Sequence, residues 1–493
     1  MPDRMLALSG GPAGTSAQGF CSIKLSSFAN ATVRRARRTM RSGCRNRAVW
    51  WRDLDVSSTR AGIHVIDRFR FALTFAGRRL LTAPMRRRLR WAYAGVVGSQ
   101  LGRHRSFRKR TLAGGIAVTG QLRAPSGLGA GARAFARWFV RQGAVVHGLN
   151  VNIYQREVDF ETLPKAPHEF GGLALCVSNP PHLAQDLLQV RRSHLRPCYV
   201  IAHWVWELAR CPREWSRFER IVDEVWVPSE FVRGALVSIV RIPVRVVPYP
   251  LSPPPPPSRS LSSFGLPRAD FVVLTALDFR SGFYRKNVVG SVRAFRMAFG
   301  DDPRALLIVK VDGRKYEPRC ARELAAEIAN AANVVVLDDV LSSADMNSLI
   351  ANSDTILSLH RSEGFGLLLA EAMLHSKPVV ATDWSGNLDF MDENSAILVP
   401  YSLVKIKDAQ GIYAGFNAEW AEPDIESASQ ALQRLAHERQ FAAELGEKAR
   451  VRVTAFFDDA RLAAAMGFPA GSDLQRHSAG AKHSHSAIVQ SST

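Results

Sequence analysis

Short runs of β-branched and apolar residues alternate with amphipathic stretches from about Gly114 to about Leu398. Runs such as 271–277 (FVVLTAL) and 355–359 (TILSL) are almost continuously apolar, which is typical of strands buried on both faces. The stretches between such runs place apolar residues at helical spacing. Because strands that alternate with helices form parallel sheets covered on both faces, the pattern predicts an α/β fold.

A proline run divides this alternating region into two halves. Ser252 precedes five prolines, Pro253–Pro257, and polyproline is stiff and extended, so an interdomain linker is predicted here. At 493 residues the chain is longer than a domain with a single hydrophobic core usually is, so two or more domains are predicted. The predicted parts are a basic N-terminal extension over 1–110, an N-terminal Rossmann-like (acceptor) domain over 111–252, the linker over 253–260, a C-terminal Rossmann-like (donor) domain with crossing helices over 261–465, and a disordered tail over 466–493.

Candidate chemistry concentrates after the run 355–359. Glu363 and Glu371 lie eight residues apart, with a Gly-Phe-Gly turn and an apolar helical run between them. The N–H groups at that helix start have no intrahelical acceptor, so they favour an anion such as a diphosphate. The two carboxylates can accept hydrogen bonds from sugar and ribose hydroxyls. The candidate binding residues are Glu363, Gly364, Phe365, Gly366, Leu367 and Glu371, together with Ser385 and Asn387 from the loop after the next strand.

The first half carries a second glycine-rich turn. A strand-like run over 115–120 leads into Ser126-Gly127-Leu128-Gly129-Ala130-Gly131, and a helix with periodic apolar residues follows. A lone glycine-rich loop is weak evidence, but its position after the first strand of a βαβ unit strengthens it. Gly127 and Gly129 are therefore candidate donor-binding residues.

The stretch 360–401 resembles family 4 of the retaining glycosyltransferases, whose E-x7-E signature Glu363 and Glu371 match. The resemblance covers about residues 114–455. It implies a GT-B fold, in which two Rossmann-like domains face each other across a cleft. It also implies that Glu363 contacts the donor sugar and Glu371 the nucleotide ribose. The alternative is an ordinary strand–loop–helix with a surface carboxylate at 371, since a bare E-x7-E occurs by chance in many helices.

The same resemblance points to two cations after the strand 271–277. Family members place an Arg and a Lys about six residues apart on the donor diphosphate, and Arg280 and Lys286 fit this spacing. Two cations near the leaving group lower the barrier to its departure. Arg285 is a rival for the arginine role, and a solvated basic loop is the alternative for each residue.

The string Trp204-Val205-Trp206-Glu207 follows another predicted strand. It resembles a W-x-W-E-L string in a subgroup of the family associated with bacterial surface-polysaccharide synthesis. His203, at the end of the strand, is a candidate catalytic residue that would line the cleft. The alternative is a histidine that is packed or merely exposed. The same two possibilities, a residue of the cleft or one without a role there, apply to Glu207.

The net positive charge of the chain comes almost entirely from the N-terminal extension. Residues 1–110 contain 24 Lys and Arg against 4 Asp and Glu, a net charge of +20, whereas the whole chain carries +21. Apolar residues mix with arginines over 66–93, so residues 31–110 could lie on an anionic membrane surface. Contact with nucleic acid, a helical cap with a solvated face and translation from an upstream start codon are the alternatives. No specific nucleic-acid partner is expected.

The absence of targeting signals and the cysteine spacing predict the cellular compartment and bear on a metal site. The sequence contains no clear targeting segment and no run of about 18 apolar residues, so no transmembrane helix is expected. Six cysteines without pair spacing favour a reducing cytosol and no metal site. We therefore expect a cytoplasmic protein, peripheral on the inner face of the membrane.

These observations lead to one functional hypothesis. The chain is predicted to be a retaining, metal-independent glycosyltransferase that moves a sugar from a nucleotide-diphosphate sugar to a glycan or lipid-linked acceptor. It would act in bacterial surface-polysaccharide biosynthesis, and the donor is a substrate, so no cofactor is expected. The alternatives are a non-catalytic GT-B scaffold of a polysaccharide-assembly complex, or another GT-B enzyme such as a sugar-nucleotide epimerase.

The charge distribution predicts a difference in vesicle binding. The full chain should bind vesicles that contain anionic lipid and should dissociate as salt rises, because screening shortens the reach of surface charges. A chain that lacks residues 1–110 should bind at neither low nor high salt in the same co-sedimentation assay. Equal binding by both chains would refute the anchor.

Overall fold

The computed structural model describes a defined part of the chain. Every element described below belongs to the unit Ala83–Thr493. Residues 31–82 of the predicted membrane-binding segment lie outside the described residues. The described residues are 85, 89, 91, 92, 94, 95 and 98, followed by 115–151, 160, 163–164, 172–180, 182–189, 198–413 and 415–468.

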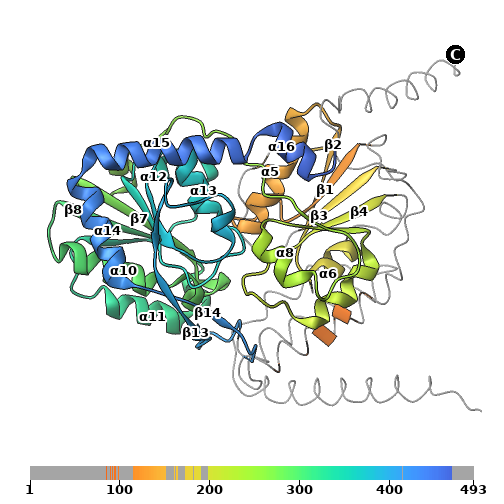
Figure 1. Ribbon diagram of the computed structural model, residues 1–493, viewed down its shortest axis with the longest axis horizontal. Helices are drawn as coiled ribbons and strands as arrows, with labels where there is room; N and C mark the ends of the chain where they lie inside the picture. Colours follow the sequence, from red (N-terminus) through yellow and green to blue (C-terminus); the bar gives the residue numbers. More distant parts are fainter. Residues whose placement is uncertain are drawn as a thin grey trace, which may run out of the picture. The chain divides into compact units, whose positions relative to one another are not determined.

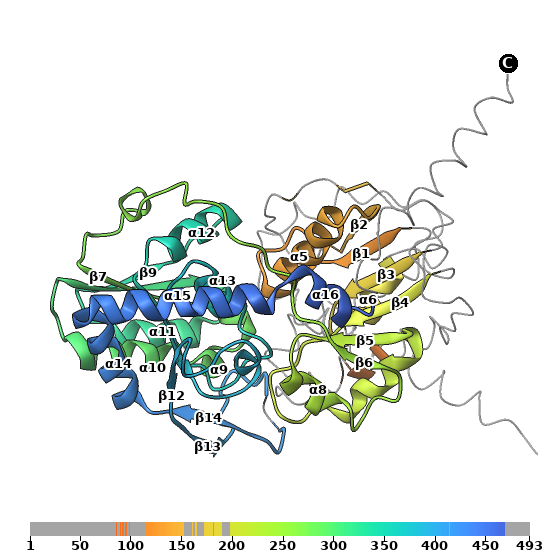
Figure 2. The ribbon, with the colours of Figure 1, turned by 45° about the horizontal axis from the view of Figure 1, so that its top comes forward.

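The first sheet has six parallel strands in the order β2-β1-β3-β4-β5-β6 (Figures 1 and 2). Alternate residues of β1 face opposite sides: Ile116 and Val118 pack with α5, whereas Ala117 packs with α6 and α8. The elements are β1 (Ile116–Gly120), α5 (Gly127–Arg141), β2 (Val146–Asn150), β3 (Leu173–Val177), α6 (His182–Gln189), β4 (Tyr199–His203), η3 (Arg213–Ile221), β5 (Glu224–Val227), α8 (Glu230–Leu236) and β6 (Val244–Val246).

The second sheet repeats this plan in the order β12-β11-β10-β7-β8-β9, again parallel throughout. Leu274 faces α13 and α15, whereas its neighbour Val273 faces α10 and α14. The elements are β7 (Phe271–Asp278), η5 (Phe279–Ser281), α9 (Phe283–Lys286), α10 (Val288–Phe299), β8 (Ala305–Asp312), η6 (Arg314–Tyr316), α11 (Pro318–Glu327), β9 (Val334–Leu337), α12 (Ser343–Ala351), β10 (Thr355–Ser358), α13 (Leu367–Leu374), β11 (Val379–Thr382), η7 (Gly386–Asp389), β12 (Ile397–Val399), α14 (Ile425–His437), α15 (Arg439–Phe456) and α16 (Asp459–Ala465).

Burial on both faces explains the nearly continuous apolar runs. All five residues of β1 and of β3 are buried, as are all four residues of β11. Helices on both sides of a parallel sheet leave no face for water, so the strands lack the polar alternation of a half-exposed sheet. The predicted α/β fold with parallel sheets is confirmed.

The predicted linker lies between the two sheets in sequence and is held by α12. Asn347 donates a hydrogen bond to the carbonyl oxygen of Pro255 at 3.0 Å, and Ser348 Oγ accepts one from the backbone of Ser258 at 3.0 Å. At the other end of the chain, α16 returns to the first sheet. Its Asp459 accepts a hydrogen bond of 2.7 Å from the indole of Trp138 in α5. The predicted crossing helices would return from the second half of the chain to the first, and this contact between α16 and α5 is of that kind.

An antiparallel hairpin was not predicted from the sequence. It consists of β13 (Tyr401–Lys405) and β14 (Glu419–Pro423), and its loop carries Tyr413 and Phe416. These aromatic side chains belong to the same apolar cluster as Trp206, which follows β4 of the first sheet. The hairpin therefore connects the second half of the chain to the first through side-chain packing.

Two predicted segment ends fall within folded structure. Met466 and Phe468, assigned to the tail, are buried, and the ring of Phe468 lies 6.3 Å from that of Phe139. Ala94, assigned to the extension, is also buried, and the ring of Trp91 lies 6.4 Å from that of Phe416. The folded part therefore includes residues on both sides of the predicted core, while the exact domain boundaries stay predictions.

The packing of Trp91 and Ala94 predicts different outcomes for two truncations. A chain that begins at residue 83 should unfold at nearly the temperature of the full chain. A chain that begins at residue 111 should lose about 2–5 kcal/mol of stability, because it exposes the apolar surface under Trp91 and Ala94. Thermal unfolding of the three chains tests this. Equal melting temperatures for the two truncated chains would show that the contact contributes little.

Candidate functional site

The candidate site lies where the order of the second sheet reverses. Strands β8 and β9 follow β7 on one side, and β10 lies on its other side, so the carboxyl ends of β7 and β10 meet at a topological switch point. Ligands of open parallel sheets bind at such points. Lys286 follows β7 and Glu363 follows β10, so the topology brings together two residues separated by 77 positions.

Glu363 is the centre of a buried ionic cluster. Lys286 Nζ donates a hydrogen bond to its Oε1, and Arg285 Nη1 lies 3.1 Å from its Oε2. Burial alone would raise the pKa of Glu363, but the charges of Arg285 and Lys286 outweigh it and lower the pKa to about 2. The carboxylate is therefore ionised at physiological pH and acts only as a hydrogen-bond acceptor. The Lys286 side chain retains 25% exposure, so it is not sealed off from a ligand.

The Gly-Phe-Gly turn has the backbone geometry that only glycine tolerates well. Gly366, the N-cap of α13, has φ of +100°, and no side chain caps this helix start. Gly386 packs so closely on the turn that a Cβ there would lie 2.3 Å from the carbonyl oxygen of Gly364. Phe365 is buried, with its ring 5.0 Å from that of Phe390. The turn is therefore held by the packing of Phe365 on Phe390, and it presents backbone N–H groups at the start of α13.

The loop after β11 supports Glu363 directly. Ser385 Oγ accepts a hydrogen bond of 2.8 Å from the backbone N–H of Glu363, and Ser385 itself has φ of +81°. Asn387 Nδ2 donates to the carbonyl oxygen of Thr382 at 3.2 Å, while its buried Oδ1 has no hydrogen-bond partner among the described residues. The structure thus places Ser385 and Asn387 beside the turn. Ser385 supports the backbone of Glu363, and Asn387 Oδ1 is able to accept a further hydrogen bond.

The glycine-rich loop of the first sheet meets the same helix start. Ser126 caps α5 by accepting a hydrogen bond of 3.1 Å from Gly129 N–H. A Cβ on Gly129 would lie 2.4 Å from the carbonyl oxygen of Ala124, which explains the glycine. A Cβ on Gly127 would lie 3.9 Å from Leu367 Cδ1, at the first residue of α13. The two helix starts, and hence Gly127 and Leu367, therefore lie side by side.

Glu371 lies one turn into α13 and is half-buried. Burial raises its pKa to about 7, and the charge of Arg133 on α5 opposes this shift. Arg133 donates hydrogen bonds of 3.0 and 2.9 Å to the carbonyl oxygens of Leu122 and Ala124, which hold it under the glycine-rich loop. Glu371 is therefore a carboxylate that changes its charge near neutral pH beside two helix starts.

The two candidate arginines have different surroundings. Arg280 donates to Asp278 at 2.8 Å and to Asp312 at 2.6 Å, so two carboxylates hold it. Arg285 is buried, donates to the carbonyl oxygen of Ser362 at 2.7 Å and pairs with Glu363. The spacing singled out Arg280, but of the two arginines it is Arg285 that contacts Glu363. The role of Arg280 at a diphosphate stays a prediction.

His203 lies in an aromatic cluster. Its ring centre lies 4.7 Å from that of Tyr249 and 5.1 Å from that of Phe135, and its side chain is fully buried. Its Nε2 is 3.1 Å from the carbonyl oxygen of Val247. Burial lowers its pKa to about 4, so the ring is neutral at physiological pH. This geometry is that of a packed histidine, and the catalytic role of His203 stays a prediction.

Two residues of the site had no signal in the sequence. His360 is fully buried just before Glu363, and neither ring nitrogen has a recorded hydrogen-bond partner among the described residues. Burial lowers its pKa to about 4. Tyr413 lies more than 100 positions from Arg285, but the hairpin brings the two together: burial raises the pKa of the Tyr413 hydroxyl, and the charge of Arg285 opposes this shift. Short motifs cannot indicate either contact.

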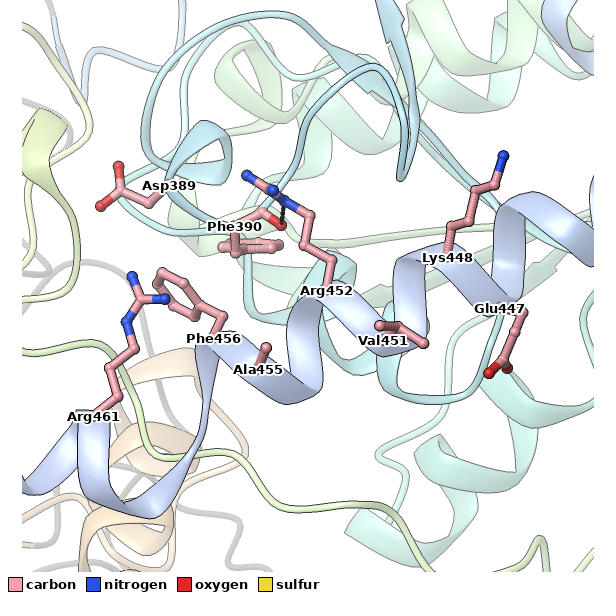
Figure 3. Close-up of a pocket in the computed structure, with 9 residues that line it drawn as sticks. All are labelled: Asp389, Phe390, Glu447, Lys448, Val451, Arg452, Ala455, Phe456 and Arg461. Carbon is pink, nitrogen blue, oxygen red and sulfur yellow. Dashed lines mark hydrogen bonds between the residues drawn. The ribbon is translucent and has the colours of Figure 1, made fainter.

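An open groove elsewhere contains none of the predicted site residues. It has a volume of about 500 Å³ and runs along α15 toward α16 (Figure 3). Arg452, one of its residues, is already paired with Asp392 at 2.8 Å. The lining residues are Asp389, Phe390, Glu447, Lys448, Val451, Arg452, Ala455, Phe456 and Arg461.

Comparison with known proteins agrees with this geometry. The family model described as glycosyl transferases group 1 matches residues 279–414, which include Arg280, Lys286, Glu363 and Glu371. No curated protein matches the chain.

Solved structures show the fold. The chain is similar to Anabaena Alr3699/HepE in complex with UDP and glucose, with 15% identity and a TM-score of 0.52 over 72% of this chain and 98% of that chain. It is also similar to sucrose-phosphate synthase from Thermosynechococcus elongatus, with 17% identity and a TM-score of 0.50 over 71% and 97%. The match to S. aureus TarM spans about half of that protein (54%), with 12% identity, a TM-score of 0.43 and 60% of this chain covered. The chain has the GT-B fold, as the resemblance implied.

The pKa of Glu371 predicts a stability effect. Its pKa of about 7 in the folded chain exceeds the ordinary value of 4.5, so the folded state holds a proton that the unfolded state releases. Stability therefore falls as pH rises from about 4.5 through 7. Glu371→Gln should be more stable than the native chain at pH 8, by at most about 3 kcal/mol, and by less because water screens a half-buried group.

Chemical denaturation at pH 5 and pH 8 measures this difference, and the variant should gain more stability at pH 8 than at pH 5. The exposed Glu393→Gln serves as the control and should change neither value. A Glu371→Gln chain that is less stable than the native chain at pH 8 would contradict the raised pKa.

Proposed function

We propose that the chain is a retaining glycosyltransferase that moves a sugar from a nucleotide-diphosphate sugar to a glycan or lipid-linked acceptor. The observation that carries the proposal is the buried cluster of Glu363 with Lys286 and Arg285 at the switch point, directly before the uncapped start of α13. This cluster lies within the region that matches the glycosyl transferases group 1 model.

Each part of the site suits one part of such a donor. The first-turn N–H groups of α13 and the ammonium of Lys286 suit the diphosphate, because both present positive charge to an anion. Glu363 is ionised at physiological pH, so it can accept hydrogen bonds from hydroxyl groups of the donor sugar. Glu371, further along α13, suits the ribose hydroxyls. The glycine-rich loop at Gly127 lies close enough to α13 to cover the phosphates.

The same groups support departure of the leaving group. Cleavage of the sugar–phosphate bond leaves negative charge on the nucleoside diphosphate, which Lys286 and the helix start stabilise. In our proposal the acceptor hydroxyl attacks the face that the leaving group vacates, which retains the anomeric configuration. The departing phosphate takes the proton of that hydroxyl, so the step needs neither an enzyme nucleophile nor a metal ion.

The structural neighbours support the choice of donor class. The Anabaena HepE structure contains UDP and glucose. A second structure of that protein, which matches this chain with a TM-score of 0.50, contains UDP-glucose. A nucleotide sugar is thus a ligand of a protein with this fold. We extend this class of ligand to the present chain because Lys286, Glu363 and Glu371 supply groups of the matching chemistry.

The setting that we propose is bacterial surface-polysaccharide biosynthesis in the cytoplasm, at the inner face of the membrane. The W-x-W-E string and the basic extension are the features that support it. Among the described residues, no helix is long and apolar enough to cross a membrane. The attachment that we propose is peripheral and electrostatic, because the extension is strongly basic, and vesicle binding by the full chain tests it.

A panel of UDP, GDP and ADP sugars tests the function. One donor class should raise the melting temperature of the chain, and the chain should then hydrolyse that donor slowly in the presence of excess EDTA. Lys286→Ala should lower the hydrolysis rate by about 100- to 1,000-fold, because it removes a cation from the developing charge. The exposed Lys448→Ala on α15 is the control and should keep the native rate.

Two results would contradict the proposal. If no donor binds, or binding occurs without any hydrolysis or transfer, the non-catalytic scaffold is favoured. If activity disappears with EDTA and returns with magnesium or manganese, the metal-free mechanism is wrong.

A further inference from the structure

The string Trp204-Val205-Trp206-Glu207 combines two packing tryptophans with one carboxylate. The ring of Trp204 lies 5.7 Å from that of Trp215, and the ring of Trp206 lies 5.2 Å from the same residue. The indole N–H of Trp206 donates to the carbonyl oxygen of Arg210 at 2.9 Å. The two tryptophans therefore fix the path of the backbone after β4, and Glu207 follows at a defined place.

That place is beside the donor-binding turn. A Cβ on Gly364 would lie 2.6 Å from Val205 Cγ1 and 2.9 Å from the carbonyl oxygen of Trp206, so the two backbones touch. Glu207 directly follows Trp206, and Glu363 directly precedes Gly364. The contact thus brings a carboxylate from the first sheet close to the carboxylate that we assign to the donor sugar.

Tyr413 holds Glu207 in position. Its hydroxyl donates a hydrogen bond of 3.2 Å to Glu207 Oε2. Its ring is buried 6.0 Å from that of Trp206, and its backbone N–H is fixed by Asp408 at 2.7 Å. This is the one hydrogen bond recorded for the Glu207 side chain within the described part of the chain, so Oε1 keeps its capacity to accept.

Glu207 shares the electrostatic surroundings of the donor cluster without a salt bridge of its own among the described residues. Burial raises the pKa of Glu207; the charges of Arg285 and Lys286 oppose this shift, and that of Glu363 adds to it. Both cations already pair with Glu363. The half-buried Glu207 carboxylate is therefore available for a neutral partner with hydroxyl groups.

We propose that Glu207, positioned by Tyr413, accepts a hydrogen bond from a hydroxyl group of a sugar acceptor and orients that acceptor against the donor. The inference rests on the proposed function and concerns the acceptor alone. Glu207 comes from the first sheet, whereas Lys286, Glu363 and Glu371, the groups assigned to the donor, come from the second. A carboxylate oxygen accepts hydrogen bonds from sugar hydroxyls, and its place beside the donor turn makes it a positioning residue.

The test compares transfer with donor hydrolysis. The native chain is given the donor that it binds in the nucleotide-sugar panel, with a panel of p-nitrophenyl glycosides as acceptor probes. Glu207→Gln should lower kcat/KM for transfer to the glycoside by about 10- to 150-fold, the range of a lost charged hydrogen bond. Nucleoside diphosphate affinity and the rate of donor hydrolysis without glycoside should stay within about threefold of native. Tyr413→Phe, which keeps the ring, should shift the same ratio in the same direction by less.

Glu214→Gln is the matched control, because this exposed carboxylate of η3 lies seven positions away and should change nothing. Equal losses of transfer and hydrolysis in Glu207→Gln, or lost nucleoside diphosphate binding, would overturn the acceptor role. So would a native chain that hydrolyses donor but neither transfers to any glycoside nor shows saturation-transfer NMR signals from one. A native chain that binds no donor at all would instead overturn the proposed function.

Discussion

The ionised carboxylate of Glu363 is the constraint on which the rest of the site depends. A buried charge is costly unless opposite charges and hydrogen bonds compensate for it, and removal of one partner of a buried pair typically costs about 3–5 kcal/mol. Arg285 and Lys286 supply the opposite charges. The backbone N–H of Glu363 is satisfied by Ser385. The segments that follow β7, β10 and β11 are therefore required to meet in one arrangement.

The local backbone is shaped to meet this requirement. Asn287 adopts φ of +50°, which ends α9 just after Lys286, and its side chain donates to the carbonyl oxygen of Leu359 at 2.9 Å. Arg361 N–H donates to the carbonyl oxygen of Arg285 at 2.7 Å. These bonds tie the segment after β7 to the segment after β10. The cations are thus presented by a rigid support, as electrostatic stabilisation of a transition state requires.

A second set of contacts joins the two sheets. Ser229 Oγ donates to the carbonyl oxygen of Gly364 at 2.7 Å, so the start of α8 binds the turn beside Glu363. The hairpin of β13 and β14 places Tyr413 and Phe416 on Trp206. Aromatic side chains bury large areas, so these rings strengthen the contact. The donor groups and the W-x-W-E string therefore belong to one connected network.

Much of this architecture follows from local sequence signals. The buried strands are recognisable because parallel strands covered on both faces must be apolar throughout, and the proline run separates the two sheets. Glu363 and the glycine turns are recognisable because each lies in a segment that follows a strand, where a parallel sheet presents its ligand-binding edge. Lys286 is recognisable only through the Arg–Lys spacing of the family that the chain resembles. The tertiary structure alone decided that Arg285 contacts Glu363, since residue spacing does not reveal which side chain turns inward. It likewise placed His203 in an aromatic cluster and brought Tyr413 to Glu207, because burial and long-range contacts depend on packing between segments that are distant in sequence.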